Sequence, residues 1–416
     1  MDPHQHCLRR LRSTLRLAEQ AESLDFPYTF AKSAVHELTE LLRDRLAGIT
    51  ALDVSLNYTV RKTLYKESLG MIAIALTYLG FLVRSTDVRN AFELYEPIAE
   101  LVTGLVDETV TDPKLVLSSE WDYSPFTYNH PSILGMDDYV FIGMPASETG
   151  NALVTPLAGH EIGHNVWRTR KLASHFEPMI TKKTLAVIGH ELWGEFERIY
   201  PELTTPTDLF SVHGLRIWKT PISWAMRQLE ELFCDFIGIR YFGDSFLHAY
   251  AYLVTPAIPG QRSVLYPSHT ERIEAHERAA RRFNLPIPID YASFFEEADN
   301  PPNTGLFLKV TKRVIEDHLE ELLNKVDEIV VNSGLELYDQ TRVEAIVERF
   351  KLAVPANEQE SLANIIGAGW RFYLSDFETW DTQYPDLFGN ENDRESMLSD
   401  LLFKSMEVSH VKGAYN

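Results

Sequence analysis

One nine-residue segment, Gly-His-Glu-Ile-Gly-His-Asn-Val-Trp at 159–167, restricts the fold of this chain most. Its two histidines, His160 and His164, are four residues apart, so a helix would place both imidazoles on one face, one turn apart. Thr155 and Pro156 predict the start of that helix, because Thr can cap a helix and Pro suits its first position. Two imidazoles arranged in this way can bind a single zinc ion.

Glu161 follows the first of these histidines and offers the carboxylate that metal-assisted hydrolysis requires. Zinc lowers the pKa of water, and a neighbouring carboxylate can then take the proton. The alternative is that His160 and His164 are two surface histidines on an amphipathic helix. Gly159 and Gly163 favour a metal site, because small residues leave room for a close approach of another backbone.

A catalytic zinc with two histidines needs a third protein ligand and one open position. The best candidate is Glu231, which lies four residues before Asp235 in a segment whose other residues are largely apolar. Buried carboxylates need a cation or hydrogen-bond donors. Zinc would therefore bind Glu231, and a histidine N–H would donate a hydrogen bond to Asp235. Glu230 is the rival ligand, and an ordinary helix with exposed acids is the alternative.

These residues together resemble the gluzincin class of zinc metallopeptidases, which includes thermolysin-like enzymes and the CaaX prenyl-protease-like group. The resemblance covers about residues 135–285. It implies roles for five residues: His160, His164 and Glu231 as metal ligands, Glu161 as general base, and Asp235 as the acceptor from a ligand histidine. The gap between the motifs is longer than in thermolysin-like enzymes, so an insertion is expected at about 170–220. CaaX-protease-like members tolerate longer gaps but are membrane proteins, which leaves the substrate class open.

A third segment, 265–273, is similar to the His-Pro…Arg segment that follows the third ligand in the CaaX-protease-like group. Pro267 and Arg272 match in spacing, whereas Tyr266 stands where that family has His. Tyr266 or His269 could donate a hydrogen bond to an oxyanion. Arg272 could orient a carboxylate through a bidentate contact.

The same segment has a simpler interpretation as the start of a helix. Ser268 and Glu271 are three residues apart and match a capping box. Further upstream, Thr220 and Pro221 repeat the pattern of a cap followed by proline, and Gly243 predicts the end of that helix.

Helical spacing of apolar residues dominates both ends of the chain, and two short strand-like runs, 114–117 and 139–144, lie between them. A further helix is expected from about residue 88 to 106. We therefore expect a mainly α (α+β) fold with a zincin-like metallopeptidase core and a small sheet. The expected domains are an N-terminal helical region (1–110), the zincin-like domain (111–285) and a C-terminal helical region (286–416).

The composition indicates which partners the protein is expected to have and where in the cell it is expected to act. The chain has 39 basic and 60 acidic residues and a formal net charge of −21, which disfavours nucleic acid and anionic membranes as main partners. The longest uncharged apolar run, 69–83, is shorter than the roughly 18 residues that span a bilayer. There is no apolar signal segment near the N-terminus, and Cys7 and Cys234 cannot form a disulfide framework. We expect a cytoplasmic protein without a membrane span.

The sequence thus predicts a zinc metallopeptidase with one zinc ion per chain and Glu161 as general base for a metal-activated water. The Gly-Ala-Met-Glu-Asn motif of gluzincin aminopeptidases is missing, which favours an endopeptidase acting on peptides or proteins. The strand at 139–144 could bind an extended substrate by strand addition. Two alternatives are a zinc hydrolase of a small non-peptide amide and a non-enzymatic regulatory or binding protein. The helical flanks suggest a protein partner or a homo-oligomer.

Overall fold

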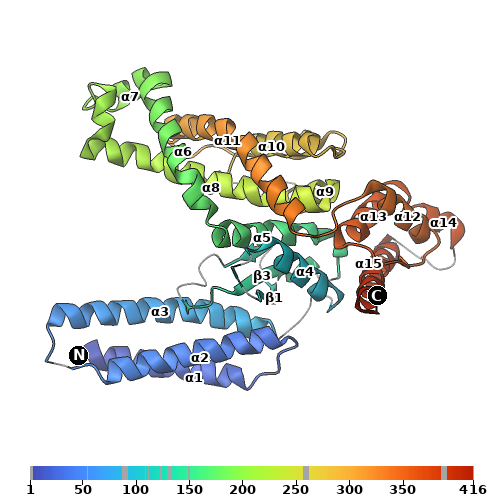
Figure 1. Ribbon diagram of the computed structural model, residues 1–416, viewed down its shortest axis with the longest axis horizontal. Coiled ribbons are helices and arrows are strands. Elements are labelled where there is room, and N and C mark those ends of the chain that lie inside the picture. Colours follow the sequence, from blue (N-terminus) through green and yellow to red (C-terminus); the bar gives the residue numbers. More distant parts are fainter. Residues whose placement is uncertain are drawn as a thin grey trace. The chain divides into compact units, whose positions relative to one another are not determined.

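The fold is mainly helical and contains a small three-stranded sheet, as predicted (Figure 1). The computed structural model describes residues 3–53, 55–86, 92–107, 109–110, 112–121, 124–128, 134–148, 150–255, 262–385 and 391–415. Contacts divide the chain into two units. Unit 1 comprises 1–103 and 108–150, and unit 2 comprises 104–107 and 151–416.

Unit 1 combines three long helices with the sheet. Its elements are α1 (Pro3–Glu22), α2 (Thr29–Thr50), α3 (Tyr58–Arg84), η1 (Phe92–Leu94), α4 (Tyr95–Leu105), β1 (Lys114–Glu120), β2 (Phe126–Thr127), β3 (Tyr139–Pro145) and η3 (Ala146–Glu148). The two strands predicted from the sequence are confirmed as β1 and β3. The start predicted for the fourth helix, near residue 88, lies outside the described residues.

The sheet has the order β1-β3-β2, so β3 is its central strand. β1 runs parallel to β3 along its whole length, and β2 pairs antiparallel with Ile142 and Gly143. All residues of β3 are buried. The sequence leads us to expect that an extended substrate could pair with β3. Because β1 and β2 already pair with this strand, a substrate could pair only with the part of β3 that they leave unpaired.

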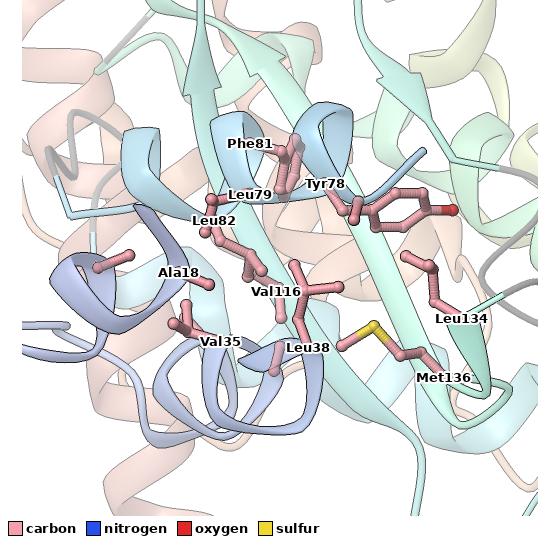
Figure 2. Close-up of a cluster of buried hydrophobic side chains, with 14 of the residues drawn as sticks. Ala18, Val35, Leu38, Tyr78, Leu79, Phe81, Leu82, Val116, Leu134 and Met136 are labelled. Atoms are coloured by element: carbon pink, nitrogen blue, oxygen red, sulfur yellow. The ribbon is translucent and has the colours of Figure 1, made fainter. Parts of the chain in front are cut away.

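The core of unit 1 lies where α2 and α3 pack against the sheet, and α1 packs on these two helices. Figure 2 shows Val35 and Leu38 of α2, Phe81 of α3 and Val116 of β1 within one buried cluster. Phe81 also meets Phe141 of β3 edge to face, with ring centroids 5.7 Å apart. These contacts tie the sheet to the N-terminal helices, whereas the sequence predicts the sheet in the central domain.

Among the described helices, α3 is long and apolar enough to cross a membrane by length and composition. In this structure 39% of its most apolar 18-residue window is buried. The buried side chains include Ile72, Ala75 and Leu79, which recur at helical spacing. A core helix of a globular protein has the same properties.

Unit 2 is built around one long helix, α8 (Val212–Phe242), against which α5, α6, α10 and α11 pack (Figure 1). Its other elements are η4 (Ala152–Val154), α5 (Pro156–Thr169), α6 (Leu172–Ala186), the π-helical turn η5 (Val187–Glu191), α7 (Trp193–Ile199), η6 (Pro206–Phe210), α9 (Asp244–Val254), α10 (His269–Arg282), η7 (Tyr291–Phe294), α11 (Gly305–Asn332), α12 (Gln340–Lys351), α13 (Leu362–Ser375), α14 (Thr379–Gln383) and α15 (Glu391–Tyr415).

Of two helix starts predicted from a cap followed by proline, one is confirmed and one is wrong. α5 begins at Pro156, but the Thr155 side chain does not cap it, and the Thr155 hydroxyl is buried without a hydrogen-bond partner among the described residues. The predicted start of α8 at Pro221 is wrong, because Ser211 caps the helix and Pro221 lies inside it. α11 packs on α8, and the Thr311 hydroxyl donates to the Pro221 carbonyl oxygen at 3.5 Å.

Two other end signals are confirmed. Gly243 ends α8 with a positive φ of 66°, a conformation that favours glycine. α10 begins with the predicted capping box: the Ser268 hydroxyl accepts from the Glu271 N–H, and the Glu271 carboxylate accepts from the Ser268 N–H. α10 therefore begins one residue after Ser268.

Candidate metal centre

Glycines allow α5 and α8 to approach closely. A Cβ atom at Gly163 would lie 2.7 Å from the Cα atom of Cys234, and one at Gly159 would lie 3.0 Å from the Phe242 ring and 3.4 Å from the Gly238 Cα atom. No side chain fits at Gly163 without a shift of the opposing backbone, and one at Gly159 would require the Phe242 ring to move slightly. The small residues of the motif thus bring the imidazoles of α5 next to the carboxylates of α8.

The structure brings together the two histidines of α5 and Glu231 of α8. His160 Nε2 lies 3.4 Å from Glu231 Oε2, and His164 Nε2 lies 3.7 Å from Glu231 Oε1. The imidazole rings are nearly perpendicular, with centroids 4.9 Å apart. The Glu231 side chain is only 1% exposed. One nitrogen of each ring therefore faces the buried Glu231 carboxylate.

The other nitrogen of each imidazole is already engaged by a carboxylate. His160 Nδ1 lies 2.8 Å from Asp235 Oδ1, and His164 Nδ1 lies 2.9 Å from Glu230 Oε1. An ionised carboxylate only accepts, so the proton of each neutral ring resides on Nδ1. The lone pair of each Nε2 is then directed away from these acids and is available to a metal ion.

Asp235 is also held by two residues of α10. Arg272 donates to both of its oxygens, from Nε at 2.6 Å and from Nη2 at 2.8 Å, and His276 Nε2 lies 2.8 Å from Oδ2. The Arg272 guanidinium stacks over the Tyr250 ring at 4.9 Å. We call Arg272, Asp235 and His160 the inner chain. Burial alone would raise the pKa of Asp235, but Arg272 and His276 hold it well below its usual range.

A second arginine stands in the same relation to the other imidazole. Arg227 Nη1 lies 3.0 Å from Glu230 Oε2, and its Nη2 lies 2.8 Å from Glu231 Oε1. We call Arg227, Glu230 and His164 the outer chain. The outer chain is more exposed than the inner chain, since the Arg227 side chain is 28% exposed and that of Glu230 is 16% exposed.

The charges around the site sum to a negative value. Two arginines face four acids, which are Glu161, Glu230, Glu231 and Asp235. With every acid ionised and every imidazole neutral, the set carries a net charge of −2. Buried charge of this kind is costly unless a counter-ion meets it, and a divalent cation would balance it.

The pKa values reflect the same need for a cation. Burial by itself lowers the pKa of His160, but its hydrogen bonds with Asp235 and Glu231 raise it to about 10. Burial would raise the pKa of Glu231, but His160 and the other nearby cations lower it to about 2. Burial raises the pKa of Glu161, and the two imidazoles only partly offset that rise. A proton on His160 thus supplies positive charge to the site.

Cys234, a buried residue that lies between Glu231 and Asp235 on α8, is a further candidate ligand. Ligand atoms of His160, His164 and Cys234 all lie within 4.8 Å of one another, so this group could hold a metal ion. Burial raises the pKa of the Cys234 thiol well above its usual range, and Glu230 and Glu231 raise it further. A metal binds the thiolate form of cysteine, so Cys234 would have to lose its proton to act as a ligand.

The two predicted oxyanion donors are placed differently. The Tyr266 hydroxyl forms a hydrogen bond with Arg227, and its pKa is raised by burial and by the charge of Glu231. The residue remains 41% exposed. His269 stacks on Phe295, with ring centroids 6.1 Å apart. Tyr266 thus belongs to the surroundings of the outer chain, and His269 packs against an aromatic ring.

Sequence reasoning missed Arg227 and His276. A signal existed for each, because Arg227 lies four residues before Glu231 and His276 lies four residues after Arg272 on predicted helices. Glu230, considered only as a rival ligand, serves instead as the partner of His164 Nδ1.

Comparisons with known proteins add no relative. No family model matches the chain, and neither a curated protein nor a solved structure is significantly similar to it. What the fold and the site define is a mainly helical protein with a buried group of side chains that could hold a metal ion.

Proposed function

We propose that this chain is a zinc-dependent hydrolase that cleaves peptide bonds. The observation that carries the proposal is that His160 Nε2 and His164 Nε2 lie 3.4 and 3.7 Å from the buried Glu231 carboxylate, while both Nδ1 atoms are engaged by acids. Two imidazoles and one carboxylate form a donor set that zinc uses in catalytic sites with one open position. The resemblance to gluzincins supports the same assignment.

The residues present fit such an ion. Glu231 Oε1 is buried and makes no well-aligned hydrogen bond, although Arg227 Nη2 lies 2.8 Å away. The net charge of −2 described above equals the charge that one Zn²⁺ would neutralise. Zinc, when bound, supplies Lewis-acid chemistry that polarises a carbonyl group and makes water more acidic.

Glu161 is the residue that we propose as general base and acid. Its carboxylate is buried, and burial raises its pKa above the ordinary value. A carboxylate oxygen of Glu161 would take a proton from the attacking water and then deliver it to the nitrogen of the leaving amine. Such a shuttle works best when the pKa of the carrier lies near the working pH.

Tyr266 is the better placed of the two proposed oxyanion donors. Its hydroxyl lies beside Arg227 and Glu231, and its side chain remains accessible to a substrate. A phenol donor at this position would stabilise negative charge on the scissile carbonyl oxygen. Arg272 donates to Asp235 through two nitrogens, so we propose that it orients His160 and does not contact the substrate.

Metal analysis tests the proposal most directly. The purified protein should contain about one zinc per chain, and His160→Ala or His164→Ala should lose it. Glu231→Gln should also lose zinc, whereas Cys234→Ser should retain it. Retention of zinc by either histidine variant would refute the site. Loss in Cys234→Ser with retention in Glu231→Gln would make the thiolate the third ligand.

One observation favours a second candidate, a hydrolase of small amides. Glu161 is only 7% exposed, and the His160 side chain is only 12% exposed, so entry to the site is narrow. Comparison of a denatured protein, short peptides and small acyl amides as substrates of the zinc-loaded protein separates the two activities. Cleavage restricted to small amides would replace the peptidase proposal.

A further inference from the structure

Arg227 contacts both the proposed third ligand, Glu231, and the acid behind the second imidazole, Glu230, at close range. Its Nη2 atom lies 2.8 Å from Glu231 Oε1, and its Nη1 atom lies 3.0 Å from Glu230 Oε2. Arg227 precedes these acids by four and three residues on α8, so all three side chains emerge from the same side of adjacent helical turns.

This arrangement offsets the repulsion between two neighbouring carboxylates. Glu230 and Glu231 are adjacent in sequence, and each carboxylate lies against an imidazole of α5. Two neighbouring carboxylates that are largely buried repel each other unless a cation lies between them. The planar guanidinium, with donors in a fixed fork, can hold both carboxylates in defined orientations at once.

Arg272, the arginine of the inner chain, does not hold Glu231 in the same way. Arg272 uses Nε and Nη2 for Asp235, and its Nη2 is 3.9 Å from Glu231 Oε2. Asp235 also accepts from His276, so two donors of α10, Arg272 and His276, hold the one acid of the inner chain. The contacts described for the Glu230 carboxylate are those with His164 and Arg227.

We propose that Arg227 is a positioning residue of the metal centre. Its guanidinium fixes the Glu231 carboxylate for metal binding and, through Glu230, keeps the His164 proton on Nδ1. One side chain thereby orients two of the three ligands. The inference rests on the proposed function, because it assumes that Glu231 and His164 bind the ion.

Zinc affinity, measured by competition with a chromogenic chelator, tests this role without reference to activity. Arg227→Gln should bind zinc roughly 10- to 100-fold more weakly than the parent, the usual effect of removing a partner behind a ligand. Arg227→Lys should be intermediate, because an ammonium group is a point charge that meets one carboxylate at a time. Cobalt(II) loaded into the Lys variant should show a shifted visible spectrum, since the ligand geometry changes.

Arg240→Gln is a matched control. Arg240 lies on the same helix, pairs with Asp327 Oδ1 at 2.7 Å and has a similar side-chain exposure of 22%. It lies about 20 Å further along α8, so its loss should leave zinc affinity unchanged. A loss of affinity in Arg240→Gln equal to that in Arg227→Gln would indicate a general effect on the helix and overturn the proposal.

The outcomes separate this inference from the function on which it rests. A parent that binds no zinc refutes the proposed function and the inference with it. A parent that binds zinc, with Arg227→Gln unchanged or tighter, refutes the inference alone, and tighter binding would make Arg227 a competitor of the metal. If Arg227→Gln does not fold, Arg227→Lys decides: several-fold weaker zinc binding supports the proposal, and parental affinity with a parental cobalt spectrum overturns it.

Discussion

At the scale of single residues, Glu161 separates metal binding from proton transfer. Glu161→Gln preserves the shape of the side chain but cannot accept a proton at neutral pH. We expect this variant to retain its zinc while turnover falls by roughly 100- to 10,000-fold, the usual contribution of a positioned acid–base group. Zinc content and turnover should be measured on the same preparation. Loss of zinc in Glu161→Gln would instead make Glu161 a ligand.

The spacing of motif residues carries information about the site because helical geometry is regular. His160 and His164, and likewise Glu231 and Asp235, must share a helix face at a separation of four. Which acid meets which imidazole depends on the packing of α5 against α8, and short-range patterns do not encode that packing. Glu230 was therefore predicted as a rival ligand, although it binds the Nδ1 atom of His164.

At the scale of helices, the spacing between α5 and α8 depends on Gly163. A methyl group there would lie 2.7 Å from the Cys234 Cα atom, which is backbone and cannot rotate away. Gly163→Ala should therefore separate the helices, destabilise the protein by roughly 1–3 kcal/mol as overpacked cores do, and weaken zinc binding. Urea unfolding and zinc titration provide the two measurements.

Gly70→Ala serves as the control for this substitution. Gly70 is an exposed glycine within α3, and an added Cβ atom would have no neighbour within 4 Å. The change should stabilise the protein by roughly 0.5–1 kcal/mol, because alanine loses less backbone entropy in a helix. If the two variants had equal stability, close packing at Gly163 would not limit the site.

Helix ends show why local signals succeed in some places only. Gly243 and the box formed by Ser268 and Glu271 act through backbone groups within a few residues, so the sequence reveals them. The signal at Thr220 and Pro221 was misleading, because contacts with distant helices outweigh the cost of one proline within α8. Propensity is a weak guide where tertiary packing decides.

At the scale of the whole molecule, a half-buried histidine of α9, His248, gives a pH dependence to stability. Burial lowers the pKa of His248 to about 4, and its ring stacks on Trp370. Between the ordinary value of about 6.5 and pH 4 the unfolded chain binds a proton that the folded chain does not. Stability should therefore fall as pH is lowered across this window, by at most about 3 kcal/mol from this group.

His248→Phe isolates this contribution, since it keeps an aromatic ring against Trp370 and removes the titratable group. In the presence of a chelator, urea unfolding of parent and variant should give free energies that diverge between pH 4 and 6.5. The variant should have the flatter profile. Parallel profiles would mean that His248 titrates alike in the folded and unfolded states.

The division into units was the hardest property to predict. The strand-like runs at 114–117 and 139–144 were identified by composition, but composition does not reveal their partners. Val116 and Phe141 belong to a buried cluster with side chains of α2 and α3, which are far away in sequence. The sheet thus groups with the N-terminal helices, and every residue of the candidate metal centre lies in unit 2.

The two arginine–carboxylate–imidazole chains also restrict how such a protein can diverge. Loss of Glu230 alone would leave Arg227 without one of its two acids and His164 without its acceptor. Loss of Arg227 and Glu230 together would remove one positive and one negative charge, so the net charge of the site would stay the same. Asp235 has three donors, so no single compensating substitution could accompany its loss. Among descendants of a common ancestor, Arg227 and Glu230 should therefore be inherited or replaced together, and Asp235 should persist for as long as the site binds metal.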